Sequence, residues 1–196
     1  MPMIKARLLN AGVEAALWPS QFGFRSACST EDAIFIARRR VELAKAQRNG
    51  KLSLLALDWA KAFASLNINA LLDALRRYGV PDDLLVFLKN ILMEREFFVR
   101  EGECQSRAHP QRSGISQGCT LSPLLFVMAM SVLLQDALSQ LSPAAAEAYA
   151  NGDLSDIVYA DDTFLLGVNA AHVQEYLNAI VKAGKLYGLE MHFGKF

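Results

Sequence analysis

Residues 156–168, DIVYADDTFLLGV, are the stretch from which the fold can be derived. Two apolar runs, residues 156–160 and 163–168, are separated only by Asp161 and Asp162. Apolar runs of this length joined by two turn-forming residues are typical of a tight β-hairpin, which here would carry both acids at its tip. Aspartate is common in turns, so an isolated pair of this kind is more often a solvated turn than a functional site.

A third acid, Asp58, gives the hairpin pair a second interpretation. It ends residues 51–58, KLSLLALD, whose leucines and preceding Asn-Gly turn predict a largely buried strand. We expect the fold to bring Asp58 beside Asp161 and Asp162, where three carboxylates would need a cation between them. Oxygen ligands without nearby His or Cys favour Mg²⁺ or Mn²⁺ over zinc. Paired metals on shared carboxylates are the usual device for in-line displacement at phosphorus.

The remaining patterns complete an α+β fold, with strands on one side and helices packed behind them. Apolar residues at helical spacing, bounded by capping and stop residues, predict the helices. These span residues 32–47, 69–78, 82–92, 121–141 and 170–187. Residues 95–100 and 104–108 predict a second hairpin, and residues 189–193 a last short strand. Ser29 is the expected N-cap of the first predicted helix.

A glycine-rich segment, RSGISQG at residues 112–118, precedes the helix expected at residues 121–141. Its two glycines give a flexible backbone with exposed amides, which suits close approach by a phosphate or a base pair. The plain structural interpretation is a loop with a helix cap, in which Ser122 is the N-cap and Pro123 the first helical residue. Both interpretations can hold, because the cap explains Ser122 and Pro123 but not Gln117 between the glycines.

The composition is that of a folded chain with one sizeable core. Of 196 residues, 53% are hydrophobic and 20% are charged, which excludes a disordered tail and favours one domain. The longest apolar run, residues 121–134, is interrupted by polar residues and is too short to cross a bilayer core of roughly 30 Å. The N-terminus lacks the pattern of a secretory signal. Cys28, Cys104 and Cys119 are too scattered for a disulfide framework or a zinc site, which predicts reduced, intracellular thiols.

Charge is distributed unevenly along the chain, although 20 Lys and Arg balance 20 Asp and Glu. Residues 1–50 carry 8 basic and 4 acidic residues, residues 51–112 carry 9 and 8, and residues 113–196 carry 3 and 8. Such a gradient is expected if one part of the chain holds a polyanion and another gathers carboxylates around a cation. On charge alone, ordinary variation of the surface is the simpler explanation.

Four segments resemble, in order and in spacing, the palm motifs of reverse transcriptases, closest to those of non-LTR retrotransposons. They are LDWAKAF (57–63), SGISQGCTLSPLLF (113–126), VYADDTFLLG (158–167) and GLEMHFGKF (188–196). Residues 21–35, QFGFRSACSTEDAIF, resemble the Gly-Phe-Arg segment that precedes the first palm strand in these enzymes. The resemblance implies a polymerase palm, in which an antiparallel sheet with a ferredoxin-like core is backed by helices, together with a partial helical fingers region.

The resemblance also implies catalytic roles for four residues. Asp58, Asp161 and Asp162 would form the acidic triad that holds two Mg²⁺ ions, for which Mn²⁺ could substitute. Lys195 matches the lysine of the fourth motif, near the leaving phosphate, where a cation or a general acid would help. No His or Cys nucleophile is needed, because transfer at phosphorus depends mainly on positioning and charge neutralisation.

Four further residues match positions that contact substrate in the family. Phe63 matches the aromatic residue beneath the sugar that excludes a 2′-hydroxyl, and Gln117 and Gly118 match the segment that contacts the template and the incoming nucleotide. Arg25 would contact template phosphates. The implied partners are an RNA template, a DNA or RNA primer and deoxynucleoside triphosphates, with no membrane. The sequence leaves open the oligomeric state and the choice between nucleus and cytoplasm.

The resemblance divides one reverse transcriptase domain into regions. Residues 1–50 would be part of the fingers and residues 51–196 a palm, with fingers elements inserted at residues 67–112 and with the motifs ending before a primer grip or thumb. Ala64 stands where family members often have Asp after the aromatic residue of the first motif. Since Asp58 is intact, this change bears more on local hydrogen bonding than on metal binding.

Two functions of different classes remain. The first is an RNA-directed DNA polymerase, part of a retrotransposon-derived protein, that transfers nucleotides to a primer 3′-hydroxyl by a two-metal mechanism. The alternative is a decayed fragment that folds without polymerising and at most binds nucleic acid. An RNA-templated RNA polymerase shares the acidic palm, but Phe63 and the Tyr159-Ala160 pair before the acids favour a reverse transcriptase.

Overall fold

The computed structural model describes residues 1–93 and 95–192 and is built around a three-stranded antiparallel sheet. The strands are β1 (Ser53–Leu57), β6 (Leu154–Tyr159) and β7 (Asp162–Gly167), with β7 in the middle. The predicted buried strand and the predicted hairpin are confirmed. The turn differs in detail, because Asp162 pairs with Tyr159 as the first residue of β7, which leaves Ala160 and Asp161 to form the turn.

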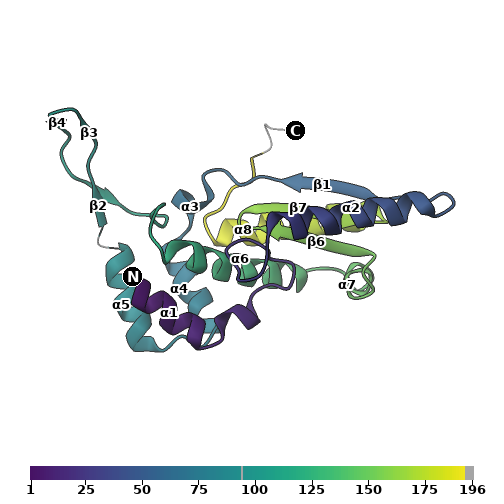
Figure 1. Cartoon of the computed structure of the whole chain (residues 1–196), viewed down its shortest axis with the longest axis horizontal. Helices are drawn as coiled ribbons and strands as arrows, with labels where there is room; N and C mark the ends of the chain where they lie inside the picture. Colours follow the sequence, from purple (N-terminus) through teal and green to yellow (C-terminus); the bar gives the residue numbers. More distant parts are fainter. Residues whose placement is uncertain (94, 193–196) are drawn as a thin grey trace.

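The helices surround this sheet in the order that the sequence predicts, with additional short ones (Figure 1). They are α1 (Pro2–Asn10), the 3₁₀ helix η1 (Val13–Ala16), α2 (Thr30–Ala46), α3 (Ala62–Ser65), α4 (Ile68–Arg77), α5 (Asp82–Met93), α6 (Ser122–Leu138), α7 (Pro143–Ala150) and α8 (Ala170–Leu186). The predicted helices correspond to α2, α4, α5, α6 and α8. The other helices were not predicted. Helix α7 begins at the Ser142-Pro143 pair, which is a common start of a helix, but no clear pattern of apolar residues at helical spacing follows it.

The two faces of the sheet are covered by different helices. Because side chains alternate along a strand, Ile157 and Leu166 lie on one face, where they pack with Ala33 of α2. Their neighbours Val158 and Leu165 belong to the main core, which includes α6 and α8. Figure 1 shows α2 lying along the sheet while α6 and α8 pass behind it. The sheet is therefore held between two layers of helix.

The helix starts show which capping predictions hold. Ser29 accepts a hydrogen bond from the Asp32 N–H and the Asp32 carboxylate accepts one from the Ser29 N–H, which confirms the predicted cap of α2. The cap predicted for α6 is wrong by one residue, because Leu121 is the N-cap and Ser122 begins the helix with its side chain buried. Pro123 is then the second helical residue, where its missing N–H still costs nothing.

Helix α6 is the central element of the core. Of its 17 residues, 13 are buried, including Phe126 and Met128, neither of which is exposed at all. A helix that is apolar all round needs partners on every side, and α4 and α8 pack against it. The long apolar run is thus a core helix, and no helix in the described part of the chain is long and apolar enough to span a membrane.

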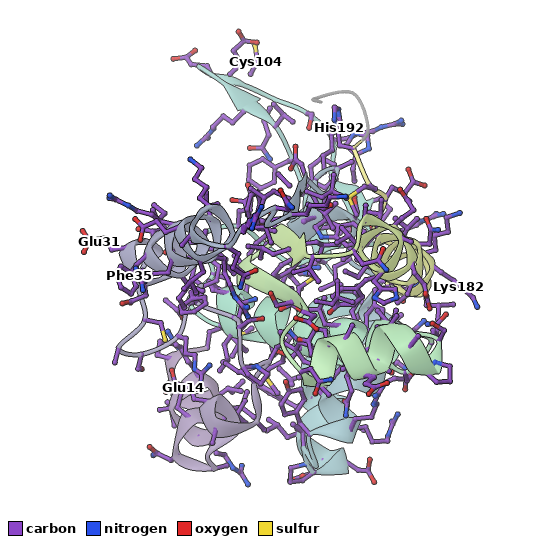
Figure 2. The ribbon with its side chains drawn as sticks, turned by 90° about the vertical axis from the view of Figure 1, so that its right-hand side faces the viewer. Glu14, Glu31, Phe35, Cys104, Lys182 and His192 are labelled. Carbon is purple, nitrogen blue, oxygen red and sulfur yellow. The ribbon has the colours of Figure 1, made fainter. Side chains whose placement is uncertain are left out.

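A ribbon between α5 and α6 projects from the body of the protein (Figure 1). It consists of β2 (Arg95–Phe97) paired with β5 (His109–Gln111), and beyond them β3 (Arg100–Glu101) paired with β4 (Cys104–Gln105). The predicted hairpin is confirmed, although its pairing is interrupted after Phe97. Figure 2 shows Cys104 at the outer tip, far from the sheet.

The segment after α8 returns to the sheet edge beside β1. Met191 forms an antiparallel bridge with Trp59, the Ala60 N–H donates to the Glu190 carbonyl at 2.8 Å, and the His192 N–H donates to the Asp58 carbonyl at 2.8 Å. Within the described residues, the strand predicted at residues 189–193 is therefore a short antiparallel pairing, and Phe193 lies outside them.

A buried carboxylate, Asp156 on β6, joins several segments that are distant in sequence. It is 4% exposed and accepts hydrogen bonds from the Trp18 indole N–H at 2.8 Å, the Tyr149 hydroxyl at 2.9 Å and the Tyr176 hydroxyl at 2.7 Å. The Ser20 hydroxyl also donates to it. Burial raises the pKa of the Tyr176 hydroxyl well above its usual value, and the adjacent Asp156 acts in the same direction, so the tyrosine stays protonated and donating.

Replacing Asp156 should be among the most destabilising single changes in the chain. Asp156→Ala leaves several buried donors without an acceptor, so the free energy of unfolding should fall by about 3–5 kcal/mol. Urea denaturation followed by circular dichroism measures the change. Asp153→Ala, at an exposed aspartate just before the same strand, is the control and should cost less than about 0.5 kcal/mol. Equal losses in the two variants would show that the hydrogen bonds to Asp156 do not hold the fold.

Candidate active site

Three acids lie at one end of the sheet. Leu57, the last residue of β1, pairs with Thr163 of β7, so the next residue, Asp58, lies beside Asp162 in the antiparallel register. Asp161 occupies the turn that joins β6 to β7. The strand pairing thus brings together residues that are about a hundred positions apart, as the sequence predicts.

The carboxyl group of Asp161 is affected by burial and by both neighbouring acids. Asp161 is half-buried, and this burial raises the pKa of its carboxyl above the usual value. The negative charges of Asp162 and Asp58 act in the same direction, whereas a backbone hydrogen bond opposes them. The end of the sheet therefore concentrates negative charge, which a cation would offset.

The three acids offer carboxylate oxygens, which suit Mg²⁺ or Mn²⁺ better than zinc. As the side chains stand, however, no three His, Cys, Asp or Glu residues among those described form a group that could hold a metal ion. The backbones of Asp58, Asp161 and Asp162 lie close together, but their carboxylates do not converge on one shared site.

Backbone contacts and packing fix the acid at the end of β1. The Asp58 carbonyl accepts the His192 N–H, and the following residue, Trp59, is 3% exposed. The Trp59 ring lies against Gly184 of α8 so closely that a Cβ at that glycine would be 2.4 Å from it. A glycine is needed there for the helix to approach the ring.

The glycine-rich loop docks on the segment that follows Asp58. The Ile115 N–H donates to the Phe63 carbonyl at 2.7 Å, and the Gly114 N–H donates to the Leu66 carbonyl at 2.8 Å. The Ser113 hydroxyl donates to the Ala64 carbonyl at 3.1 Å. Gly114 has φ +76°, and a Cβ there would be 2.3 Å from the Ala64 carbonyl oxygen, so this position requires glycine.

The predicted substrate residues lie around this junction. The Phe63 ring is partly buried and stacks on Phe126 with ring centres 4.4 Å apart, while Phe24 contacts it edge-on at 6.4 Å. Gln117 and Gly118 are exposed on the docked loop. The loop that carries Gln117 and Gly118 is therefore bonded through its backbone to the backbone of Phe63.

Of the two basic residues with predicted roles, only Arg25 lies within the described part of the chain. The Arg25 guanidinium is partly exposed and donates to the Pro19 carbonyl at 3.4 Å, in the segment that precedes α2. Lys195 lies outside the described residues, so its predicted role is untested.

Sequence reasoning missed two residues that shape the site. The Arg95 guanidinium donates to the Leu92 and Gly114 carbonyls and to the Ser116 hydroxyl, so it ties the base of the ribbon to the glycine-rich loop. Gln21 is 1% exposed and bonds to the turn between β6 and β7. The local signal for Gln21 was its place in the quoted segment QFGFR, whereas nothing local distinguishes Arg95 from a solvated arginine.

A sheet backed by helices, with acids at one end of its strands, is consistent with a polymerase palm. The chain belongs to the reverse transcriptase (RNA-dependent DNA polymerase) family, whose model matches residues 1–196. This confirms the family predicted from the sequence motifs.

Relatives within this class include retrotransposon proteins. The chain is 27% identical over 139 residues to the Pol polyprotein of the type-2 retrotransposable element R2DM from Drosophila melanogaster, covering 71% of this chain and 13% of that protein. It is 26% identical over 193 residues to a type-1 element R2 Pol polyprotein from Popillia japonica, covering 98% and 26%. The chain thus spans about a quarter or less of the length of these two relatives.

Solved structures of telomerase share the fold. Apo telomerase from Candida tropicalis, truncated from its C-terminal domain, matches with a TM-score of 0.65 at 18% identity, covering 90% of this chain and 35% of that one. Telomerase from Candida albicans in complex with a TWJ fragment of telomeric RNA matches with a TM-score of 0.66 at 15% identity, covering 90% and 31%. These matches confirm the predicted α+β class, an antiparallel sheet backed by helices.

Two glycines with similar backbone angles test the docking of the glycine-rich loop. Gly114→Ala and Gly102→Ala both place a side chain at positive φ, which costs about 1 kcal/mol. Only at Gly114 does the new Cβ meet backbone, whereas it meets nothing within 4 Å at Gly102. Gly114→Ala should therefore lower the free energy of unfolding by about 1–3 kcal/mol more than Gly102→Ala in urea denaturation. Similar losses would show that the loop does not pack on Ala64.

Proposed function

We propose that this chain carries the active site of an RNA-directed DNA polymerase, which transfers nucleotides to a primer 3′-hydroxyl under the direction of an RNA template. The observation that carries the proposal is the register of β1 and β7, which sets Asp58 beside Asp162 and next to Asp161. Membership of the reverse transcriptase family supports the same reaction. The retrotransposon relatives favour an intracellular element-derived protein.

Asp58, Asp161 and Asp162 are the proposed holders of two Mg²⁺ ions, or of Mn²⁺ in their place. Rotation of side chains on adjacent backbone positions would turn their oxygens onto a shared site. When bound, such ions lower the pKa of the attacking hydroxyl and neutralise charge on the departing pyrophosphate. The carboxylates would hold the reacting groups in line, and no side chain of this chain need form a bond to the substrate.

The neighbouring surface would receive the nucleotide and the template. Phe63, held by its stack on Phe126, would exclude a 2′-hydroxyl from the sugar site. The exposed Gln117 and Gly118 would contact the template and the incoming base pair, with Arg25 on template phosphates and Lys195 near the leaving group. The loop that carries Gln117 supports this arrangement, because its Ile115 N–H donates to the Phe63 carbonyl.

The regional assignment remains part of the proposal. Residues 1–50 would belong to the fingers, residues 51–196 to the palm, and residues 67–112 would be fingers elements inserted into it. The ribbon formed by β2 to β5 projects from the sheet-bearing body, as an inserted element would (Figure 1). The basic excess of residues 1–50 fits contact with a nucleic-acid backbone.

Removing one carboxylate should abolish primer extension without unfolding the protein. Asp161→Asn keeps the shape of the side chain and removes its charge, so Mg²⁺-dependent extension on an RNA template should fall by about 10³-fold or more. Extension by the wild-type chain should stop with EDTA and return with Mg²⁺ or Mn²⁺. The exposed Asp153→Asn is the matched control and should keep its rate.

Two results would overturn this assignment. Unchanged extension by Asp161→Asn would show that the acidic turn is not the catalytic site. Salt-sensitive RNA binding by the wild-type chain, with no metal-dependent incorporation of nucleotides, would favour the non-catalytic nucleic-acid-binding alternative.

Shortening Phe63 should relax the choice between sugars. Phe63→Val opens space beneath the sugar, so incorporation of ribonucleotides relative to deoxynucleotides should rise by about 10–100-fold. Single-nucleotide extension with each triphosphate measures the ratio. Phe87→Val, at a half-exposed phenylalanine on α5, is the control. An unchanged ratio in Phe63→Val would exclude Phe63 from the sugar site.

A further inference from the structure

Gln21 bonds to the backbone of the turn that carries Asp161. Its Oε1 accepts the Ala160 N–H at 2.8 Å, and its Nε2 donates to the Ala160 carbonyl at 3.2 Å. The side chain is 1% exposed, so water does not compete for these bonds. One amide side chain thus holds both polar groups of a residue 139 positions away.

The orientation of this amide is fixed by a third hydrogen bond. The Gly23 N–H also donates to Gln21 Oε1, at 2.8 Å. Two N–H donors that converge on one atom identify it as the oxygen, which leaves the nitrogen facing the Ala160 carbonyl. Glutamine alone meets this pattern at its length, because a carboxylate cannot donate and an apolar side chain can do neither.

Ala160 has a backbone conformation that requires support. Its φ is +58°, in the left-handed region, at the first of the two turn residues, where hairpins favour glycine. The next residue is Asp161, followed by Asp162 at the start of β7. A change in the Ala160 backbone would therefore redirect both acids.

The segment that delivers Gln21 is seated firmly on the outer edge of β6. Gln21 and Val158 form a parallel bridge, with the Phe22 N–H donating to the Val158 carbonyl at 2.7 Å and the Val158 N–H donating to the Ser20 carbonyl at 2.9 Å. Gly23 touches the turn directly, since a Cβ there would be 2.3 Å from the Ala160 nitrogen. The segment has no room to shift relative to the turn.

We infer that Gln21 is a positioning residue that holds the Ala160 turn in its left-handed conformation and thereby sets the directions of Asp161 and Asp162 toward bound metal. The inference rests on the proposed function, since metal binding by these acids is itself proposed. Gln21 makes no contact with substrate in this role and acts only through the turn.

The test compares Gln21→Met with the unaltered 196-residue chain. Methionine has similar length but forms none of the three bonds, so exchange of the Ala160 amide with deuterium should accelerate by about tenfold or more. The Asp161 and Asp162 amide signals should shift in nitrogen–proton NMR spectra. Affinity for Mn²⁺, measured by electron paramagnetic resonance on the protein alone, should fall by about tenfold. Extension should lose rate even at saturating nucleotide.

A conservative variant separates positioning from charge and guards against misfolding of Gln21→Met. Gln21→Glu keeps both accepted bonds and loses only the bond to the Ala160 carbonyl, while adding a negative charge near the acids. Charge alone would tighten Mn²⁺ binding, whereas a positioning role predicts weaker binding. Tyr187→Phe is the control, because it removes a part-buried hydrogen bond to Asp136 of α6 that involves no residue of the N-terminal segment, and it should leave the turn signals and Mn²⁺ affinity unchanged.

The outcomes distinguish this inference from the proposed function. Unchanged Ala160 exchange and unchanged Asp161 and Asp162 signals in Gln21→Met would overturn the positioning role, as would Mn²⁺ affinity equal to or tighter than wild type in the folded glutamate variant. Failure of the wild-type chain to bind Mn²⁺ would instead count against the metal site, and the amide signals would still decide whether Gln21 sets the turn.

Discussion

The buried carboxylate of Asp156 is the interaction on which the rest of the structure depends. A charge held at 4% exposure is tolerated only where hydrogen bonds replace water, and here the donors come from the N-terminal segment, α7 and α8. Those donors fix the outer strand of the sheet against both its helical backing and the chain's first residues. Trp18 and Ser20, which both bond to Asp156, lie just before Gln21. The Asp156 carboxylate therefore also helps to position Gln21 against the turn.

Strand pairing connects Asp156 to the acidic end of the sheet. Asp156 lies in the middle of β6 and the turn follows the last residue of that strand. Strand β7 then connects the turn, through its pairing with β1, to Asp58. The acids lie where the sheet ends. The hydrogen bonds between the strand backbones hold them close together despite the repulsion between their carboxylates. Burial and like charges raise the pKa of Asp161, a local cost that the rest of the fold offsets.

Much of this could be predicted from sequence, and the gaps have physical causes. The hairpin, β1 and the main helices follow from local apolar periodicity and capping residues such as Ser29, which act within a few positions. The proximity of Asp58 to the hairpin acids could be predicted as a consequence of strand pairing. The contacts of Arg95 and Gln21 could not, because each depends on a partner brought near only by tertiary packing. Ser122 was misplaced by one residue because burial, not capping, sets its position.

The long span between Gln21 and Ala160 has a consequence for the order in which the protein matures. The hairpin closes over a few residues and the helices form locally, so both can appear early in folding. The contact between Gln21 and the turn closes a loop of well over a hundred residues and can form only after both ends of that loop have been synthesised and have found each other. The acidic end of the sheet therefore acquires its final geometry only after this long-range contact has formed. By the same reasoning, detachment of the N-terminal segment would remove the support of this turn.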